Sequence, residues 1–130
     1  MEENKWIELH ESKITSNTSL EVQIAKNKSF FRKHMGLCVL MANIDFHINS
    51  DDNDDELEEL KIIFPELQKY NFDPVRTFIT IQKTDRNSID SFINAVCTIE
   101  NDSIKIESYS LEAHCKYKMC INLTLKANDL

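Results

Sequence analysis

The chain has 130 residues, 42% hydrophobic and 28% charged, and its formal net charge is −7. This length suits one domain with a single core, residues 1–130. The negative charge argues against a nucleic-acid-binding protein and against contact with an anionic membrane, because both partners favour basic surfaces.

The four cysteines and the N-terminal sequence indicate the compartment. All four cysteines lie in apolar or strand-like runs, and none belongs to a C-x-x-C motif. The first residues are acidic, whereas a secretory signal is basic and then apolar, and no apolar run is long enough to span a bilayer. We therefore expect a cytoplasmic protein with reduced, mostly buried thiols.

The first third of the chain predicts two strands. Residues 1–18 have no clear pattern, whereas residues 20–24 alternate between apolar and polar and predict a short strand. Residues 29–35 fit either a helical turn or the start of the next strand. Residues 37–49 predict a long strand, apolar on both faces at first and alternating afterwards.

The middle of the chain predicts a helix after a polar segment. Asn53 and Glu56 have the spacing of a capping box. The apolar residues that follow recur at helical spacing: Leu57, Leu60, Ile63, Phe64 and Leu67. Pro65 should break or kink this helix, or begin a second short one.

Three further elements are expected before residue 111. Residues 75–83 alternate and predict a strand. Thr84 or Asp85 can cap a helix that presents one apolar face: Ile89, Phe92, Ile93 and Val96. Ile104 and Ile106 predict a strand, and the apolar phase changes before Leu111, so an extra residue is expected at 108–110, as a bulge or a turn.

The clearest pattern of the chain covers residues 111–127. Every odd position there is apolar and most even positions are polar, as in a strand with one buried face. Fully extended, these residues would span about 56 Å, whereas the radius of gyration of such a domain is about 14 Å. The strand must therefore coil, bulge or split, for example at 116–118.

These elements together predict a fold class. About five strands and two or three helices occur in runs rather than in strict alternation. The expected class is α+β: a curved, mainly antiparallel sheet with the helices packed on one face.

One segment concentrates the negative charge of the chain. Seven of its acidic residues fall within positions 51–59: Asp51, Asp52, Asp54, Asp55, Glu56, Glu58 and Glu59. Clustered carboxylates steer a basic partner and accelerate its association, so these seven residues are the candidate partner-binding site. A plainer interpretation is a solvated loop before a helix N-terminus, which negative side chains favour. Calcium binding is disfavoured because the glycine and the closing glutamate of a calcium loop are missing.

The sequence gives little sign of catalysis or of a cofactor. Asp45 and His47 on one predicted strand, and His114 and Cys120 on another, could converge on a metal, but no pair has the spacing of a known zinc motif. The chain contains no nucleophile elbow and no phosphate-binding loop. We therefore expect no metal, no cofactor and no catalytic residues.

The leading hypothesis is a small binding protein that inhibits a basic protein partner such as a toxin or a nuclease. It would be of the bacterial immunity-protein or antitoxin type, or of the phage anti-defence type. A second hypothesis is a small-ligand-binding protein or enzyme with a pocket in the concave face of the sheet. A third is a structural homo-oligomer that pairs through the 111–127 strand.

Overall fold

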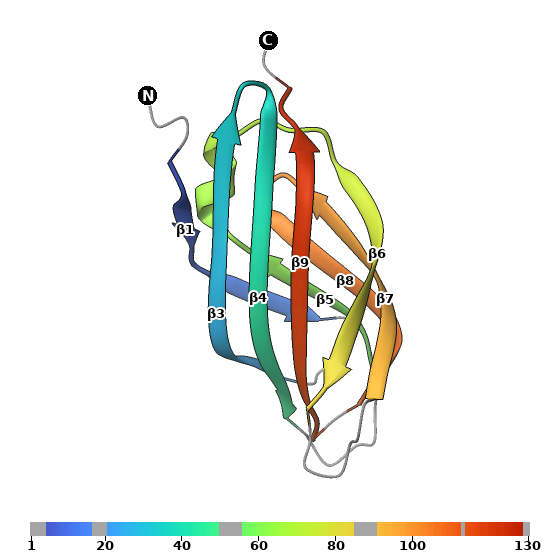
Figure 1. Cartoon of the computed structure of the whole chain (residues 1–130). Helices are drawn as coiled ribbons and strands as arrows, with labels where there is room; N and C mark the ends of the chain where they lie inside the picture. The colour runs from blue at the N-terminus through green and yellow to red at the C-terminus, as the bar shows by residue number, and fades with distance from the viewer. Residues whose placement is uncertain (1–4, 17–20, 50–55, 85–90, 113, 129–130) are drawn as a thin grey trace.

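The structure is a computed structural model that describes residues 5–16, 21–49, 56–84, 91–112 and 114–128, with side chains described at all of these positions except 56, 57, 109 and 110. It contains nine strands and one short 3-10 helix (Figure 1). The strands are β1 (Ile7–Leu9), β2 (Lys13–Ser16), β3 (Glu21–His34), β4 (Leu37–Asn49), β5 (Glu56–Ile63), β6 (Val75–Lys83), β7 (Ser91–Glu100), β8 (Ser103–Glu112) and β9 (Lys116–Lys126), and the 3-10 helix is η1 (Pro65–Lys69).

The nine strands form one curled antiparallel sheet. Their order is β1-β3-β4-β9-β6-β7-β8-β5-β2. β1 and β2 lie at opposite ends of this order, yet only three residues of chain separate them, so the sheet must curl until its two ends meet. Figure 1 shows the result as a half-barrel, in which β3, β4 and β9 run side by side and β5 and β8 cross behind them.

The core fills the inside of the curled sheet. Alternate residues of β4 point inward and are at most 1% exposed: Cys38, Leu40, Ala42, Ile44, Phe46 and Ile48. The neighbouring strand β9 contributes Tyr117, whose ring stacks on that of Phe46 with the ring centroids 5.4 Å apart. At one end Leu67 of η1 is fully buried, so the 3-10 helix helps to cover the core.

The expected α+β class is wrong. The described ranges contain no α-helix, and residues 57–67 form most of β5 followed by η1. Leu60 and Ile62 both point inward in the strand, and Phe64 is buried after it. Period-two burial therefore replaces the helical spacing, and Pro65 begins η1 where the strand has already ended.

The helix expected after Thr84 is wrong over residues 91–100, which form strand β7, whereas Asp85 and Ile89 lie outside the described residues. The inward positions of β7 are Ile93, Ala95, Cys97 and Ile99. Phe92, assigned to the buried face of that helix, is 60% exposed. Residues 29–35 likewise form no helical turn, because β3 continues to His34.

The long alternating segment keeps its phase but is divided. β8 ends at Glu112 and β9 begins at Lys116, with His114 at a φ of +66° in the turn between them. Every described odd position from 111 to 127 is buried or half-buried, as the alternation predicts. The strands expected at 37–49 and 75–83 are confirmed, and the register of the β5–β8 pair shifts opposite residues 108–110, where an irregularity was expected.

Within the described residues, no helix has both the length and the apolar character needed to cross a membrane.

Candidate functional site

Several strand ends meet at one end of the curled sheet, the lower end in Figure 1. The backbone N–H of Ile48, near the end of β4, donates to the carbonyl oxygen of Cys115 at 3.0 Å. The N–H of Thr84, after β6, donates to the carbonyl oxygen of Lys116 at 2.8 Å. Glu56, the first residue of β5, pairs with the last residue of β8, Glu112. Strand β4 ends and strand β5 begins at this end of the sheet, and residues 50–55 connect the two strands in the sequence.

The structure describes only part of the predicted partner-binding site. Asp51, Asp52, Asp54 and Asp55 lie outside the described residues. Glu56, Glu58 and Glu59 belong to β5, where Glu58 is exposed and Glu59 is half-buried. Of the plainer interpretation, the helix N-terminus is wrong over the described residues 56–59, which belong to β5, and the solvated loop falls on residues 51–55, outside the described residues.

Sheet pairing brings further carboxylates to this segment. Glu59 of β5 lies opposite Glu107 of β8, and Glu56 lies opposite Glu112. Like charges placed directly across a strand pair are destabilising. One compensation is local, because the Lys105 ammonium lies 3.7 Å from the Glu107 carboxylate. We call Glu56, Glu58, Glu59, Glu107 and Glu112 the acidic edge.

Glu112 is held in place by groups from three elements. The Lys83 Nζ atom lies 3.3 Å from Glu112 Oε2, and this hydrogen bond raises the pKa of Lys83. The thiol of Cys115 donates to the same oxygen over 3.9 Å, and the backbone N–H of Glu112 donates to the Tyr117 hydroxyl at 2.8 Å. Burial, above all, raises the pKa of Tyr117, with Cys115 adding to the effect, so its hydroxyl stays protonated at neutral pH.

The Glu112 carboxylate is accessible from solvent. The Glu112 side chain is 55% exposed, whereas that of Lys83 beside it is only 21% exposed. The carboxylate therefore faces solvent from a fixed backbone position, ready to accept a hydrogen bond from a cationic side chain. Charge-assisted hydrogen bonds of this kind are stronger than neutral ones.

Sequence reasoning missed Glu107, Glu112 and Lys83. In the sequence, Glu112 is only one of the polar even positions of residues 111–127. Nothing in the local pattern connects these residues with segment 51–59, because the pairing of β5 with β8 joins residues about fifty positions apart. Only the strand order brings them together.

The possible metal ligands do not converge. β4 and β9 are neighbours, as that arrangement requires, but Lys118 lies opposite Asp45 and Lys116 lies opposite His47. Cys120 lies opposite Asn43 instead. Across the described ranges, no three His, Cys, Asp or Glu side chains lie close enough to hold a metal ion.

The concave face of the sheet is occupied by the apolar core. A cavity of about 340 Å³ is lined by η1, the residues after it and the β7–β8 turn: Leu67, Gln68, Lys69, Tyr70, Asn71 and Asn101. Most of these side chains are polar. The second hypothesis places its pocket in the concave face of the sheet, whereas this cavity is lined by η1, the residues after it and the β7–β8 turn.

Searches with this chain found no match to a protein-family model, to a curated protein or to a solved structure.

Proposed function

We propose that this chain is a binding protein whose acidic edge, together with segment 51–55, contacts a basic protein partner. In this proposal it inhibits that partner, in the manner of an immunity protein, an antitoxin or a phage anti-defence protein. The observation that carries the proposal is the β5–β8 register, which sets Glu59 opposite Glu107 and Glu56 opposite Glu112.

The energetic argument is that this register costs stability in the isolated protein. Carboxylates that repel one another across a strand pair gain more from a cationic partner than isolated carboxylates do, since binding also relieves their repulsion. The concentrated negative field would steer a basic partner and raise the association rate, with a strong dependence on ionic strength.

Neither alternative function has comparable support. A homo-oligomer that pairs through residues 111–127 would need a free edge along that whole segment, but β9 pairs with β4 over its length and with β6 at residues 117–119. A ligand site in the concave face would need space that the core cluster occupies.

The test begins with the wild-type chain as bait in a lysate of its native host, followed by purification of any basic protein that it captures. Association of the purified pair is then measured by stopped flow at several salt concentrations. The variant is Asp52→Asn/Asp54→Asn/Asp55→Asn. At low salt we expect its association rate constant to fall about tenfold or more, with a shallower salt dependence.

The matched control removes the same number of charges elsewhere. Glu8, Asp73 and Glu100 are exposed and lie outside the acidic edge, so Glu8→Gln/Asp73→Asn/Glu100→Gln changes the net charge equally. This control should change the rate constant by less than about threefold. Equal effects of the two triple variants would show that net charge alone matters, and the proposed site would then be wrong.

A further inference from the structure

Strands β6 and β9 are neighbours in the sheet but pair over only part of their length. Their ladder comprises Ile81 with Met119, Gln82 with Lys118 and Lys83 with Tyr117. At the opposite end the two chain segments meet again, through an isolated bridge between Phe72 and Ala127. In between, β6 diverges from β9, as Figure 1 shows, and no ladder joins Val75–Thr80 to β9. We call this interval the β6–β9 opening.

The backbone direction can be assigned on both sides of the opening. Thr84 donates to the carbonyl oxygen of Lys116, and Asp73 donates to that of Lys126. Even-numbered residues of β9 thus direct their backbone groups toward β6. Odd-numbered ones face β4, as the bond from Ala127 N–H to the Gly36 carbonyl oxygen indicates.

Six residues consequently direct a backbone N–H and C=O into the opening. Because strand residues alternate, they are Arg76, Phe78 and Thr80 on β6 and Cys120, Asn122 and Thr124 on β9. The Ile81–Met119 pair joins the Thr80 carbonyl oxygen to the Cys120 N–H, and among the described residues the other ten groups have no hydrogen-bond partner in the strand ladders. A row of unsatisfied strand groups is a template for pairing with another strand.

Inward side chains at the opening are more exposed than the inward side chains of β4. The inward residues of β4 are at most 1% exposed. By contrast, Val75 and Ile79 of β6 and Leu123 of β9 point inward but are only half-buried. On the outer face beside them, the Phe78 side chain is 83% exposed. The opening therefore offers apolar surface together with backbone groups.

The charge of the two strands is opposite to that of the chain. Although the chain carries 22 acidic residues, neither β6 nor β9 contains one. The two strands carry five basic residues: Arg76, Lys83, Lys116, Lys118 and Lys126. Of these, Lys83 contacts Glu112, and Lys118 lies opposite Asp45 of β4. Arg76 and Lys126 flank the unpaired interval, which favours an acidic occupant.

Two of the devices that protect sheet edges against strand addition, proline and a bulge, are missing from both described borders of the opening. Natural sheets protect their edges with short strands, bulges, prolines or covering elements. Strand β3, for example, has a bulge between Ile24 and Lys26. By contrast, β6 and β9 contain no proline, and their described ladders show no register shift.

We propose that the β6–β9 opening binds an extended acidic segment of a partner protein, which adds a strand to the sheet there. Alternate side chains of that segment would be apolar and would pack on Val75, Ile79 and Leu123. The side chains between them would be acidic and would face Arg76 and Lys126. Main-chain hydrogen bonds supply affinity in such strand addition, and the alternating side chains supply specificity.

The test uses an eight-residue peptide of alternating Val and Glu, with a peptide of alternating Val and Lys as its control. Amide exchange is followed by NMR on the full chain. In the unbound protein, the amides of Arg76, Phe78, Thr80, Asn122 and Thr124 should exchange rapidly. Those of Thr77 and Ile79, which face β7, should exchange slowly. The Val-Glu peptide at millimolar concentration should slow the first set by about tenfold or more, and the Val-Lys peptide should not.

Two variants establish the site. Asn122→Pro removes one N–H that faces the opening without removing a bond of the β4–β9 ladder, and it should abolish protection by the Val-Glu peptide. Arg76→Glu leaves the backbone N–H groups at the opening in place and should reduce the affinity for the Val-Glu peptide about tenfold. The matched control is Lys61→Glu, because the Lys61 side chain is exposed and lies on β5. This control should leave peptide binding unchanged. If Asn122→Pro loses its far-UV CD spectrum, Arg76→Glu against Lys61→Glu decides the question alone.

Several outcomes would overturn the proposal. The five amides could already be protected in the dilute unbound protein, which would mean that the opening is closed. Both peptides could bind equally, or the Val-Glu peptide could leave the five amides unchanged. Protection that appears on raising the protein concentration alone would identify a second copy as the occupant, and protection by oligo-deoxythymidine alone would identify a nucleic acid.

Discussion

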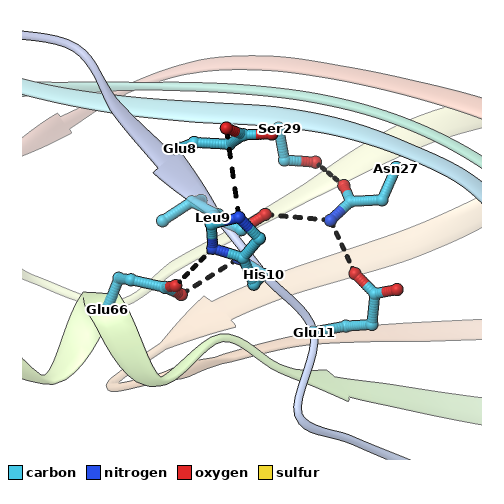
Figure 2. A network of polar contacts seen from close by, with 7 residues as sticks. All are labelled: Glu8, Leu9, His10, Glu11, Asn27, Ser29 and Glu66. Atoms are coloured by element: carbon cyan, nitrogen blue, oxygen red, sulfur yellow. Dashed lines mark hydrogen bonds and ion pairs between the residues drawn. The ribbon is translucent and has the colours of Figure 1, made fainter.

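The carboxylate of Glu66 holds residue His10 at two points (Figure 2). The backbone N–H of His10 donates to Glu66 Oε1 at 3.0 Å, and the His10 Nδ1 atom lies 2.8 Å from Oε2. Nearby, the Asn27 side chain donates to the Leu9 carbonyl oxygen and to the Glu11 carboxylate. Residues 10–12 connect β1 to β2 and so join the two ends of the sheet. These contacts attach that connection to η1 and to β3.

This pairing should make the stability of the protein depend on pH. The hydrogen bond with Glu66 raises the pKa of His10 above its ordinary 6.5, so the stabilisation is complete below that pH and is lost as pH rises through the raised pKa. Partial burial raises the pKa of Glu66, but bonds from His10 lower it more, to below 4.5. The Glu66 contribution is present above that value and is lost as pH falls.

We therefore expect His10→Gln to reduce the melting temperature most between pH 4.5 and 6.5, the window that the two ordinary pKa values define. The reduction should be small, about 1–2 °C, because the His10 side chain is exposed to solvent. Thermal melts of wild type and variant across this range and at pH 8 measure it. His34→Gln, another exposed histidine, is the control. A His10→Gln effect that is the same at pH 8 would refute the assigned role of protonation.

Tyr117→Phe should destabilise the protein without changing its fold. The Tyr117 hydroxyl is buried and accepts the N–H of Glu112 at 2.8 Å, and phenylalanine removes that acceptor while preserving the stacking on Phe46. The expected cost is about 1–2 kcal/mol, measured by urea denaturation. Tyr70→Phe is the matched control, and a cost for Tyr117→Phe no larger than for this variant would contradict the prediction.

The four cysteines should differ in the rate at which their thiols react. The structure describes all four, and none of them forms a disulfide. Cys120 is exposed, whereas Cys38, Cys97 and Cys115 are buried, and burial raises the pKa of Cys97 to about 12. A disulfide reagent added to the native protein should therefore modify one thiol rapidly, and Cys120→Ser should abolish that fast phase. All four thiols should react in denaturant. A fast phase that persists in Cys120→Ser would show that a buried thiol is accessible.

Two substitutions in the β3–β4 hairpin turn should change the stability of the protein in opposite directions. Met35 and Gly36 have φ angles of +50° and +82°, the signs that a type I′ turn requires. Met35→Asn should stabilise the protein by about 0.5–1 kcal/mol, because asparagine adopts positive φ more readily than methionine. Gly36→Ala should destabilise it by about 1 kcal/mol, although a Cβ there would meet no atom within 4 Å. Chemical denaturation of both variants measures these changes in the free energy of unfolding. Destabilisation by Met35→Asn or stabilisation by Gly36→Ala would contradict the assigned turn type.

The sequence predicted strands well where alternation was long. From Leu111 to Ala127 the buried phase follows the odd positions, and residues 37–49 form β4 as expected. It failed where apolar residues occupy the outer face as well. Phe92 and Val96 lie on the outward side of β7, so a strand with apolar residues on both faces resembled a helix with one apolar face.

Segment 51–59 was identified from composition alone, but its surroundings were not. Charge clustering is a local property, visible in the seven acidic residues themselves. The opposition of Glu59 to Glu107, and the partners of Glu112, depend on which strand lies beside β5. The β6–β9 opening likewise arises from the path that β6 takes away from its neighbour.

By itself the sequence determined which side of β9, of β6 and of the second half of β4 faces the core, since the two-residue period is a local consequence of strand geometry. It also placed the negative charge in one segment. Only the tertiary structure decided that the chain is sheet almost throughout, which strands are neighbours and where their pairing stops. Those properties depend on contacts between residues far apart in the chain, and hydrophobic spacing within one short segment cannot specify them.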